Sequence, residues 1–125
     1  MKKTSKPKQT DNTREIAKAI AQAAFDTKAK DIAVLDLRKL SHFTDYFVIA
    51  TGTSDRQVQA IADNIRDDVE GQKVRPTNVE GYAEGHWVLL DYGTVVAHIF
   101  YEETREFYSL EKLWGDAPRV KFRLK

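Results

Sequence analysis

The residue types that most often carry chemistry form few groupings in this sequence, and the first is a turn before a helix. Gly52-Thr53-Ser54 separates an apolar run from an amphipathic run, so its backbone N–H groups would lie at a helix start, where anions bind. The turn lacks the lysine and second glycine of a phosphate-binding P-loop, and Asp55 would place negative charge beside a phosphate. We therefore interpret the turn as a helix start capped by Ser54, with an anion site as the alternative.

The histidines and carboxylates do not form a catalytic or metal-binding pattern. The sequence has three histidines: His42, His86 and His98. None belongs to a motif such as H-E-x-x-H, and no D-x-D pair of carboxylates lies on a predicted strand. No serine has a histidine partner by motif, and the absence of cysteine excludes a thiol nucleophile and a thiolate zinc site. We therefore predict no catalytic residue, no metal and no cofactor, in a protein that is not an enzyme.

Two amphipathic helices are predicted from apolar residues at helical spacing. The first spans residues 11–28, and the second begins after Ser54 and stops at Gly71. Ser54 and Gln57 occupy the two positions of a capping box, in which Gln57 reaches back to the backbone of the capping residue. A shorter helix is expected from Glu103 to about Trp114.

Short apolar runs between the helices are typical of buried strands. Residues 31–37 and 46–51 have this character, whereas residues 74–79 contain Pro76 and suit the edge of a sheet. The order helix, strand, strand, helix and further strands predicts an α/β fold with helices packed on the sheet.

Residues 86–101 predict a β-hairpin that is apolar on both faces. With Tyr92-Gly93 as the loop, position 89 pairs with 96 and His98 lies opposite Trp87. One face then carries Trp87, Leu89, Val96, His98 and Phe100, and the other carries Val88, Leu90, Val95, Ala97, Ile99 and Tyr101. Two long helices and one short helix are too few to cover both faces of the sheet easily. The second face is therefore expected either to be covered by the C-terminal part of the chain or to be a protein-binding surface.

Charge is distributed unevenly along the 125 residues, whose net charge is +1. Eight lysines and arginines lie in residues 1–10 and 117–125, which leaves 12 basic against 19 acidic residues, a net charge of −7, in between. We predict a disordered basic tail over residues 1–10, one domain over residues 11–116 and a basic tail over residues 117–125. The tails are either solubilising or contact RNA, whereas the acidic domain would repel a phosphate backbone.

The composition also limits where the protein works. No apolar run approaches the ~18 residues of a membrane span, and no apolar h-region follows the lysine-rich start. With no cysteine there is no disulfide framework. We expect a cytoplasmic protein without a membrane partner.

Several motifs, in their order and spacing over residues 16–114, resemble the ribosomal silencing factor family, also called the Iojap family. They are Thr44-Asp45-Tyr46-Phe47, Ala50-Thr51-Gly52-Thr53-Ser54, Val79-Glu80-Gly81, Trp87-Val88-Leu89-Leu90-Asp91-Tyr92-Gly93, Val96-Ala97-His98 and Tyr108-Ser109-Leu110-Glu111-Lys112-Leu113-Trp114. The resemblance implies a mixed-sheet, nucleotidyltransferase-like single α/β domain. In that superfamily a Gly-Ser helix start works with strand carboxylates that bind metal, but residues 88–91 lack the D-x-D partner, which argues against catalysis.

The resemblance also implies a function. Family members are translational repressors that bind the large ribosomal subunit at its intersubunit face, through its fourteenth protein, and sterically block joining of the small subunit. Two alternatives are a nucleotidyltransferase-type enzyme using Gly52, Ser54 and a carboxylate, and a direct RNA-binding protein that acts through the basic tails. Peripheral contact of the tails with ribosomal RNA is compatible with the favoured function.

We place the partner-binding surface on the hairpin. Its expected apolar or amphipathic contacts are Trp87, Leu89, Val96, His98 and Phe100, and its polar or acidic contacts are Asp91, Tyr92, Glu102 and Glu103. Trp87 is the strongest candidate, because tryptophan is frequent among the residues that dominate binding energy. Trp114 is expected to pack within the chain, and a contact in a homodimer, which the family forms, is the alternative.

Overall fold

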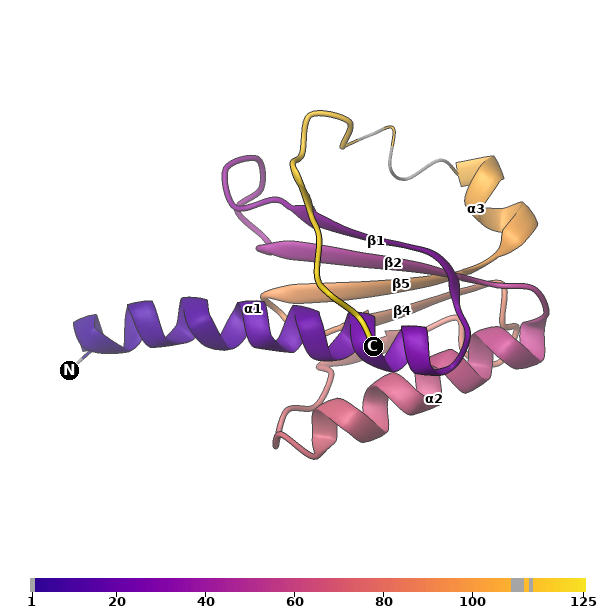
Figure 1. Cartoon of the computed structure of the whole chain (residues 1–125), viewed down its shortest axis with the longest axis horizontal. Helices are drawn as coiled ribbons and strands as arrows, with labels where there is room; N and C mark the ends of the chain where they lie inside the picture. The colour runs from indigo at the N-terminus through magenta and orange to yellow at the C-terminus, as the bar shows by residue number, and fades with distance from the viewer. Residues whose placement is uncertain (1, 109–111, 113) are drawn as a thin grey trace.

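The structure, a computed structural model, describes the backbone of residues 2–108, 112 and 114–125, and the side chains of residues 12–105, 112 and 114–125. Within these residues, two long helices cover one face of a six-stranded sheet (Figure 1). The elements are α1 (Lys2–Asp26), β1 (Lys30–Asp36), β2 (Tyr46–Gly52), α2 (Asp55–Glu70), β3 (Asn78–Glu80), β4 (Trp87–Asp91), β5 (Val95–Tyr101), α3 (Glu102–Tyr108) and β6 (Arg119–Val120).

The sheet is mixed, with the order β3-β4-β5-β2-β1-β6. Its two central strands, β2 and β5, are parallel, and every other neighbouring pair is antiparallel. A parallel pair needs a long crossover, and α2, β3 and β4 provide it. The predicted α/β class with a mixed sheet and helices packed on it is therefore confirmed.

Helices α1 and α2 lie side by side against the same face of the sheet (Figure 1). The stripe of α2 predicted from the sequence is fully buried, at Val58, Ile61, Ala62, Ile65 and Val69. In α1 the buried apolar residues run from Ile16 to Ala24. The helix itself begins at Lys2, whereas the sequence predicted a disordered tail over residues 1–10.

The start of α2 is capped as predicted, with one difference in detail. The Ser54 Oγ accepts a hydrogen bond from the backbone N–H of Gln57 at 3.0 Å. The side chain of Gln57 reaches back one residue further than a capping box requires, because its Oε1 accepts from the backbone N–H of Thr53 at 2.7 Å. Its Nε2 donates to the carbonyls of Thr27 and Lys28, so this one side chain also joins α2 to the end of α1.

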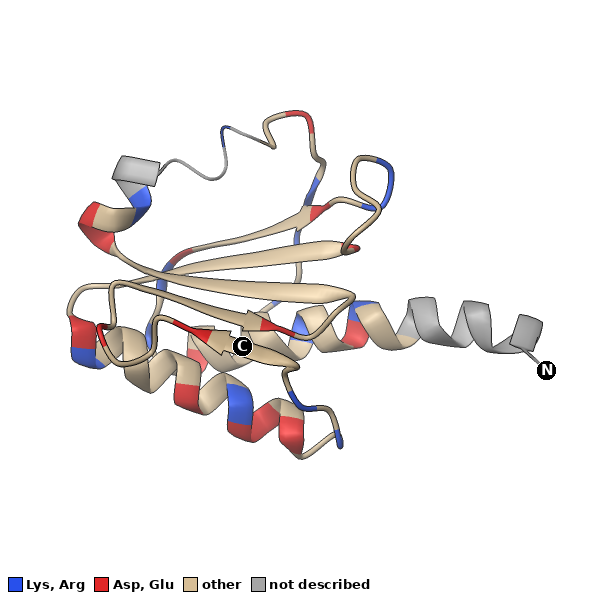
Figure 2. Cartoon of the chain, turned by 180° about the vertical axis from the view of Figure 1, so that it is seen from behind, with Lys and Arg blue, Asp and Glu red and all other residues tan. Residues whose placement is uncertain are grey.

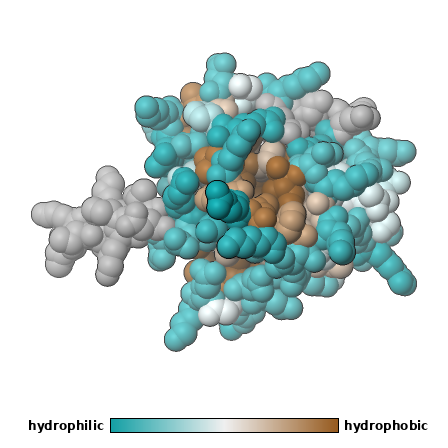
Figure 3. All heavy atoms as spheres, in the orientation of Figure 1, coloured by the Kyte–Doolittle hydropathy of each residue, from teal (hydrophilic) through white to brown (hydrophobic). Residues whose placement is uncertain are grey.

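The C-terminal segment is part of the fold and not a separate basic tail. Strand β6 pairs with β1 in antiparallel register, and Val120, Phe122 and Leu124 pack against the main core. Figure 3 shows apolar side chains gathered at the centre of the view, where α1 and the C-terminal segment cross in Figure 1. The basic residues of this segment alternate with the apolar ones. Such alternation is typical of a strand, but the prediction of a tail considered only the charge of these residues.

The hairpin of β4 and β5 has the predicted faces but a different register. Its loop is Gly93-Thr94, so Leu89 pairs with His98 and Trp87 pairs with Phe100. The register differs by two residues from the prediction. Since side chains alternate with a period of two, this shift leaves every residue on its predicted face. Gly93 has φ +84°, a conformation that favours glycine.

Candidate functional site

The predicted site lies on the face of the sheet turned away from α1 and α2, which we call the distal face. Its inner residues form a second buried cluster: Ala33, Leu35, Leu37, Ile49, Phe100 and Ala117. The chain covers the β1 and β2 side of this face itself. Ala117 is buried there, and Trp114 meets Phe47 edge to face with ring centroids 5.9 Å apart. Trp114 therefore packs within the chain, as expected.

The β4 and β5 side of the distal face is less completely covered. Trp87, Leu89 and Val96 are half-buried and share this face, because they alternate with the buried residues Val88, Leu90 and others beneath the helices. An apolar surface in this state is suited to contact with another molecule. The C-terminal part of the chain thus covers one half of the face, and for the other half a protein-binding surface stays a prediction.

Trp87 packs against two buried residues of β5. Its ring lies against Phe100 at a centroid distance of 4.9 Å, and its Nε1–H donates to the Nδ1 of His98 at 3.1 Å. Phe100 is fully buried and His98 is 4% exposed. These two predicted contact residues therefore support the surface from beneath, and a partner would touch Trp87 above them.

The state of His98 follows from these contacts. Its Nδ1 accepts a hydrogen bond, so the neutral ring carries its proton on Nε2, and that buried atom has no hydrogen-bond partner among the residues that the structure describes. Burial lowers the pKa of His98 from 6.5 to about 4. The side chain is therefore uncharged at neutral pH. Its ring also meets Phe47 edge to face at 4.5 Å, which couples β5 to β2.

The polar residues predicted for the site are dispersed. Asp91 is half-buried at one end of β4, where its Oδ1 accepts from the backbone N–H of Gly93 at 2.8 Å. Glu102 and Glu103 are exposed at the other end of the hairpin, and Glu102 forms an exposed ion pair with Lys30 at 3.1 Å. The structure therefore brings the carboxylates to opposite ends of the same surface.

Tyr92 is the exception among the predicted contacts. It belongs to the core beneath the helices and is only 8% exposed, and burial raises its pKa to about 12. Its parity along the chain places it with Leu90 and not with Leu89, so it does not reach the distal face. A direct contact between Tyr92 and a partner on that face is therefore not supported by its position.

Sequence reasoning missed Phe47 as a member of the surface. The signal was present, since Phe47 alternates with the buried Tyr46 and Val48, but its neighbour across the sheet was not predictable. Phe47 pairs with Val96 through the parallel β2–β5 register. The sequence gives no local sign of a pairing between segments nearly fifty residues apart.

The turn at Gly52 is explained by packing and capping. A Cβ at Gly52 would lie 2.9 Å from the side chain of Val58, so a larger residue does not fit beneath the helix. The backbone N–H groups of Thr53 and Gln57 are already bonded to side chains of α2 and its cap. This supports the capped helix start over the anion site.

The described part of the chain also lacks two other kinds of site. No three of its histidines and carboxylates come together as metal ligands would. His86 lies beside Tyr101, away from the buried His98 on the distal face. Among the same residues, no helix combines the length and apolar character needed to span a bilayer.

Comparison with known proteins places this architecture among relatives. A family model described as ribosomal silencing factor during starvation matches residues 10–125. The ribosomal silencing factor of Bacillus subtilis is 47% identical over 107 residues, which are 86% of this chain and 91% of that protein. A crystal structure of a Chromobacterium violaceum protein matches with a TM-score of 0.80 and 37% identity, covering 90% of this chain and 92% of that one.

A more distant relative carries a name that mentions the large subunit. The mouse mitochondrial assembly of ribosomal large subunit protein 1 is 38% identical over 89 residues, which are 69% of this chain and 39% of that protein. The names of the bacterial and mouse relatives describe a silencing factor and an assembly factor, not enzymes. The family match over residues 10–125 and the identity with the Bacillus subtilis protein show that the chain belongs to the ribosomal silencing factor family.

Proposed function

We propose that this protein represses translation by binding the large ribosomal subunit at the face that meets the small subunit. The contact is made through the fourteenth protein of the large subunit, and the bound domain blocks joining sterically. The family name supports a silencing role, and the name of the mouse relative supports the large subunit as the partner.

The observation that carries the proposal is the partly exposed apolar surface on the β4 and β5 side of the distal face. Trp87, Leu89 and Val96 present apolar surface on this side. The ring of Trp87 is held in place by packing on the buried Phe100 and by its hydrogen bond to His98. A surface whose side chains are held in place loses less conformational entropy on binding than a mobile one. This arrangement is suited to docking and requires no chemistry.

The acidic residues on the surface of α2 favour a basic partner. Figure 2 shows acidic residues along α2 and at the start of α3. The exposed carboxylates of α2 are Asp55, Asp63, Asp67, Asp68 and Glu70. Proteins that lie within ribosomal RNA are generally basic, so the acidic surface of α2 would be attracted to such a protein and repelled by the surrounding phosphates.

Co-sedimentation with isolated ribosomal subunits tests the proposal. The protein is expected to sediment with large subunits, and small subunits added afterwards are expected to stay separate. The control is a folded Trp87→Ala variant at the same concentration, which should sediment less and leave joining intact. A protein that binds large subunits yet allows joining would contradict the steric mechanism, and one that does not bind them would contradict the partner.

A further inference from the structure

A basic surface forms where the C-terminal segment crosses α1 (Figure 1). Two contacts join the segment to this helix. The guanidinium group of Arg14 lies over the ring of Phe122, 5.1 Å from its centroid. The backbone N–H of Lys125 donates to the Oε1 of Gln22 at 3.2 Å. Because Arg14 and Gln22 are about two helical turns apart, the segment is fixed along α1 and not at a single point.

The charged side chains of the segment are turned away from the core. They alternate with the apolar residues that pack against the main core. The exposed members of this series are Lys121, Arg123 and Lys125. Such alternation is that of an extended chain, in which every second residue lies on the same side and about 6.6 Å from the last. The segment therefore presents a line of three positive charges at regular spacing.

Helix α1 extends this surface. Arg14 and Lys18 are exposed on adjacent turns of the same side. Phe25 follows Gln22 by three residues, so it also lies on this side, and 44% of it is exposed. The first turns of α1 carry four further lysines, at positions 2, 3, 6 and 8. The two basic stretches at opposite ends of the sequence thus meet along one helix.

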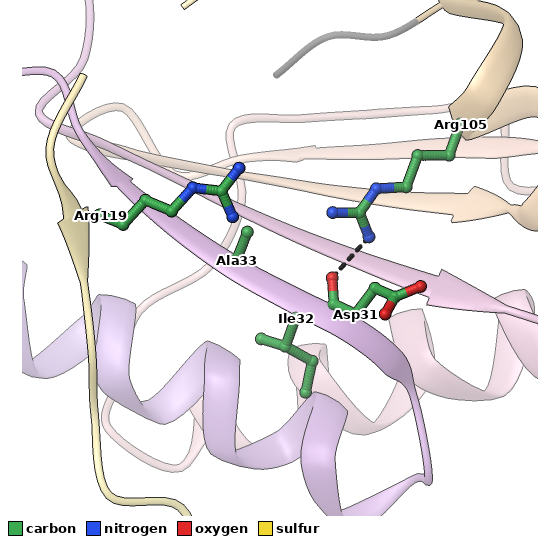
Figure 4. Close-up of a pocket in the computed structure, with 5 residues that line it drawn as sticks. All are labelled: Asp31, Ile32, Ala33, Arg105 and Arg119. Atoms are coloured by element: carbon green, nitrogen blue, oxygen red, sulfur yellow. Dashed lines mark hydrogen bonds between the residues drawn. The ribbon is translucent and has the colours of Figure 1, made fainter. Parts of the chain in front are cut away.

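Arg119 is not counted in this surface. Figure 4 shows its side chain reaching over β1, on the side from which Arg105 also reaches over that strand. Arg105 donates to the backbone carbonyl of Asp31 and to the Oγ1 of Thr51, so it fastens α3 to β1 and β2. Arg119 likewise has an interaction of its own. Only the residues beyond β6 therefore contribute to the line of charge.

Positive charge is in excess on this surface. Five exposed basic residues, two on α1 and three on the segment, lie beside two exposed carboxylates of α1, Glu15 and Asp26. Lys18, Lys121 and Arg123 form no ion pair with another residue that the structure describes. The neighbouring helix α2 is acidic, so an extended anion is attracted along the C-terminal segment and repelled from α2.

We propose that this surface binds the phosphate backbone of single-stranded RNA. Lysines and arginines that neutralise phosphates release condensed counterions, and this release supplies most of the binding that is independent of base sequence. The exposed ring of Phe25 beside the charges favours a nucleic acid over an acidic peptide, because unpaired bases stack on aromatic rings. The assignment does not depend on the proposed docking through the distal face.

Fluorescence anisotropy with a labelled oligouridylate, repeated at several salt concentrations, tests the assignment. Lys121→Gln/Arg123→Gln removes two charges from the line. The slope of log Kd against log salt concentration should then fall by about 1.4, since each phosphate contact of a single strand contributes ~0.7. Phe25→Ala should weaken binding about 10-fold without changing this slope, because stacking involves no ion release.

Lys39→Gln/Arg56→Gln is the matched control. It removes the same charge from two exposed residues, one in the loop after β1 and one at the start of α2, and should leave the slope unchanged. An equal change of slope in both double variants, or no binding of the oligouridylate, would overturn the proposal. Displacement of the RNA by polyglutamate at equal charge concentration would assign the surface to an acidic protein and would also overturn it.

Discussion

The hydrogen bond between Trp87 and His98 gives one residue two roles. Trp87 is half-buried, and its indole packs on Phe100 while its N–H donates to the histidine at 3.1 Å. A polar bond with little competing water holds the ring in one orientation. The same ring therefore contributes to the core and presents a fixed apolar surface outward.

Replacing Trp87 by alanine is expected to weaken binding to the isolated fourteenth large-subunit protein by at least ~2 kcal/mol, or roughly 30-fold in Kd, because a buried anchor is lost. Isothermal titration calorimetry measures the change. Phe25→Ala is the control, since Phe25 is an exposed aromatic residue on α1 and 44% of it is accessible. An unchanged Kd for folded Trp87→Ala would refute the placement of the surface.

The same substitution also removes the donor to His98, so a binding loss needs separation from a folding defect. Leu89→Ala separates the two effects, because Leu89 is half-buried on the same surface and its aliphatic side chain contributes only apolar contact. We expect it to weaken binding with a smaller loss of Tm than Trp87→Ala. A variant that loses Tm but keeps its affinity would assign the residue to the core alone.

The buried histidine predicts a dependence of stability on pH. Its folded pKa of about 4 lies below the unfolded value of 6.5, so the unfolded state binds more protons between these values. Above pH 6.5 the ring is neutral in both the folded and the unfolded state, so His98 does not make stability depend on pH there. Below pH 6.5 the free energy of unfolding decreases as the pH falls toward 4, by up to about 1.4 kcal/mol per pH unit. Urea unfolding across this range should show a smaller slope for His98→Gln than for the unmodified protein. Equal slopes would contradict the assignment, and His86→Gln is the exposed control.

At the scale of elements, locally encoded features were predictable and remote pairings were not. Ser54, the apolar stripe of α2 and the two faces of the hairpin follow from spacing within a few residues. The hairpin register differed by two because either Tyr92-Gly93 or Gly93-Thr94 can close the turn, and only the structure distinguishes them. Of the predicted site residues, Trp87, Leu89 and Val96 lie half-buried on the predicted face, and their contact with a partner stays a prediction. The burial of His98 and Phe100 was not predictable because it depends on neighbours from other strands, such as Phe47 beside His98 and Trp87 beside Phe100.

The packing of the C-terminal segment predicts a structural cost for its removal. Truncation after Pro118 deletes β6 and exposes the surfaces that Val120, Phe122 and Leu124 cover. The free energy of unfolding should fall by roughly 3 kcal/mol, since each of these side chains is partly buried. Chemical denaturation measures it. Lys121→Gln/Arg123→Gln keeps the apolar residues and should change stability by less than about 0.5 kcal/mol. A truncated protein of unchanged stability would restore the interpretation as a free tail.

For the whole molecule, the uneven charge predicts a salt effect on association. Residues 10–118 carry a net charge of −7 and the C-terminal strand segment, residues 119–125, carries +4, so attraction to a basic partner depends on the exposed acidic residues of α2. Attraction to a basic partner is screened by salt, so the association rate should fall about 10-fold between ~0.05 and ~0.5 M salt, while dissociation changes little. Stopped-flow mixing with the ribosomal protein measures both rates.

A matched variant connects this effect to α2. Asp67→Asn/Asp68→Asn removes two exposed carboxylates far from the distal face, so it should reduce the salt dependence of association and leave dissociation unchanged. A salt effect confined to dissociation, or one unaffected by the variant, would show that the charge of the domain does not guide the encounter.

The parallel pairing of β2 with β5 also determines when the sheet can close during synthesis. Strand β2 ends at Gly52, but its partner begins only at Val95, after α2, β3 and β4 have been made. Until then β1 occupies one edge of β2 and the other edge has no partner. The middle of the finished sheet is thus an open strand edge in the nascent chain, and an edge of that kind is prone to pair with the wrong segment.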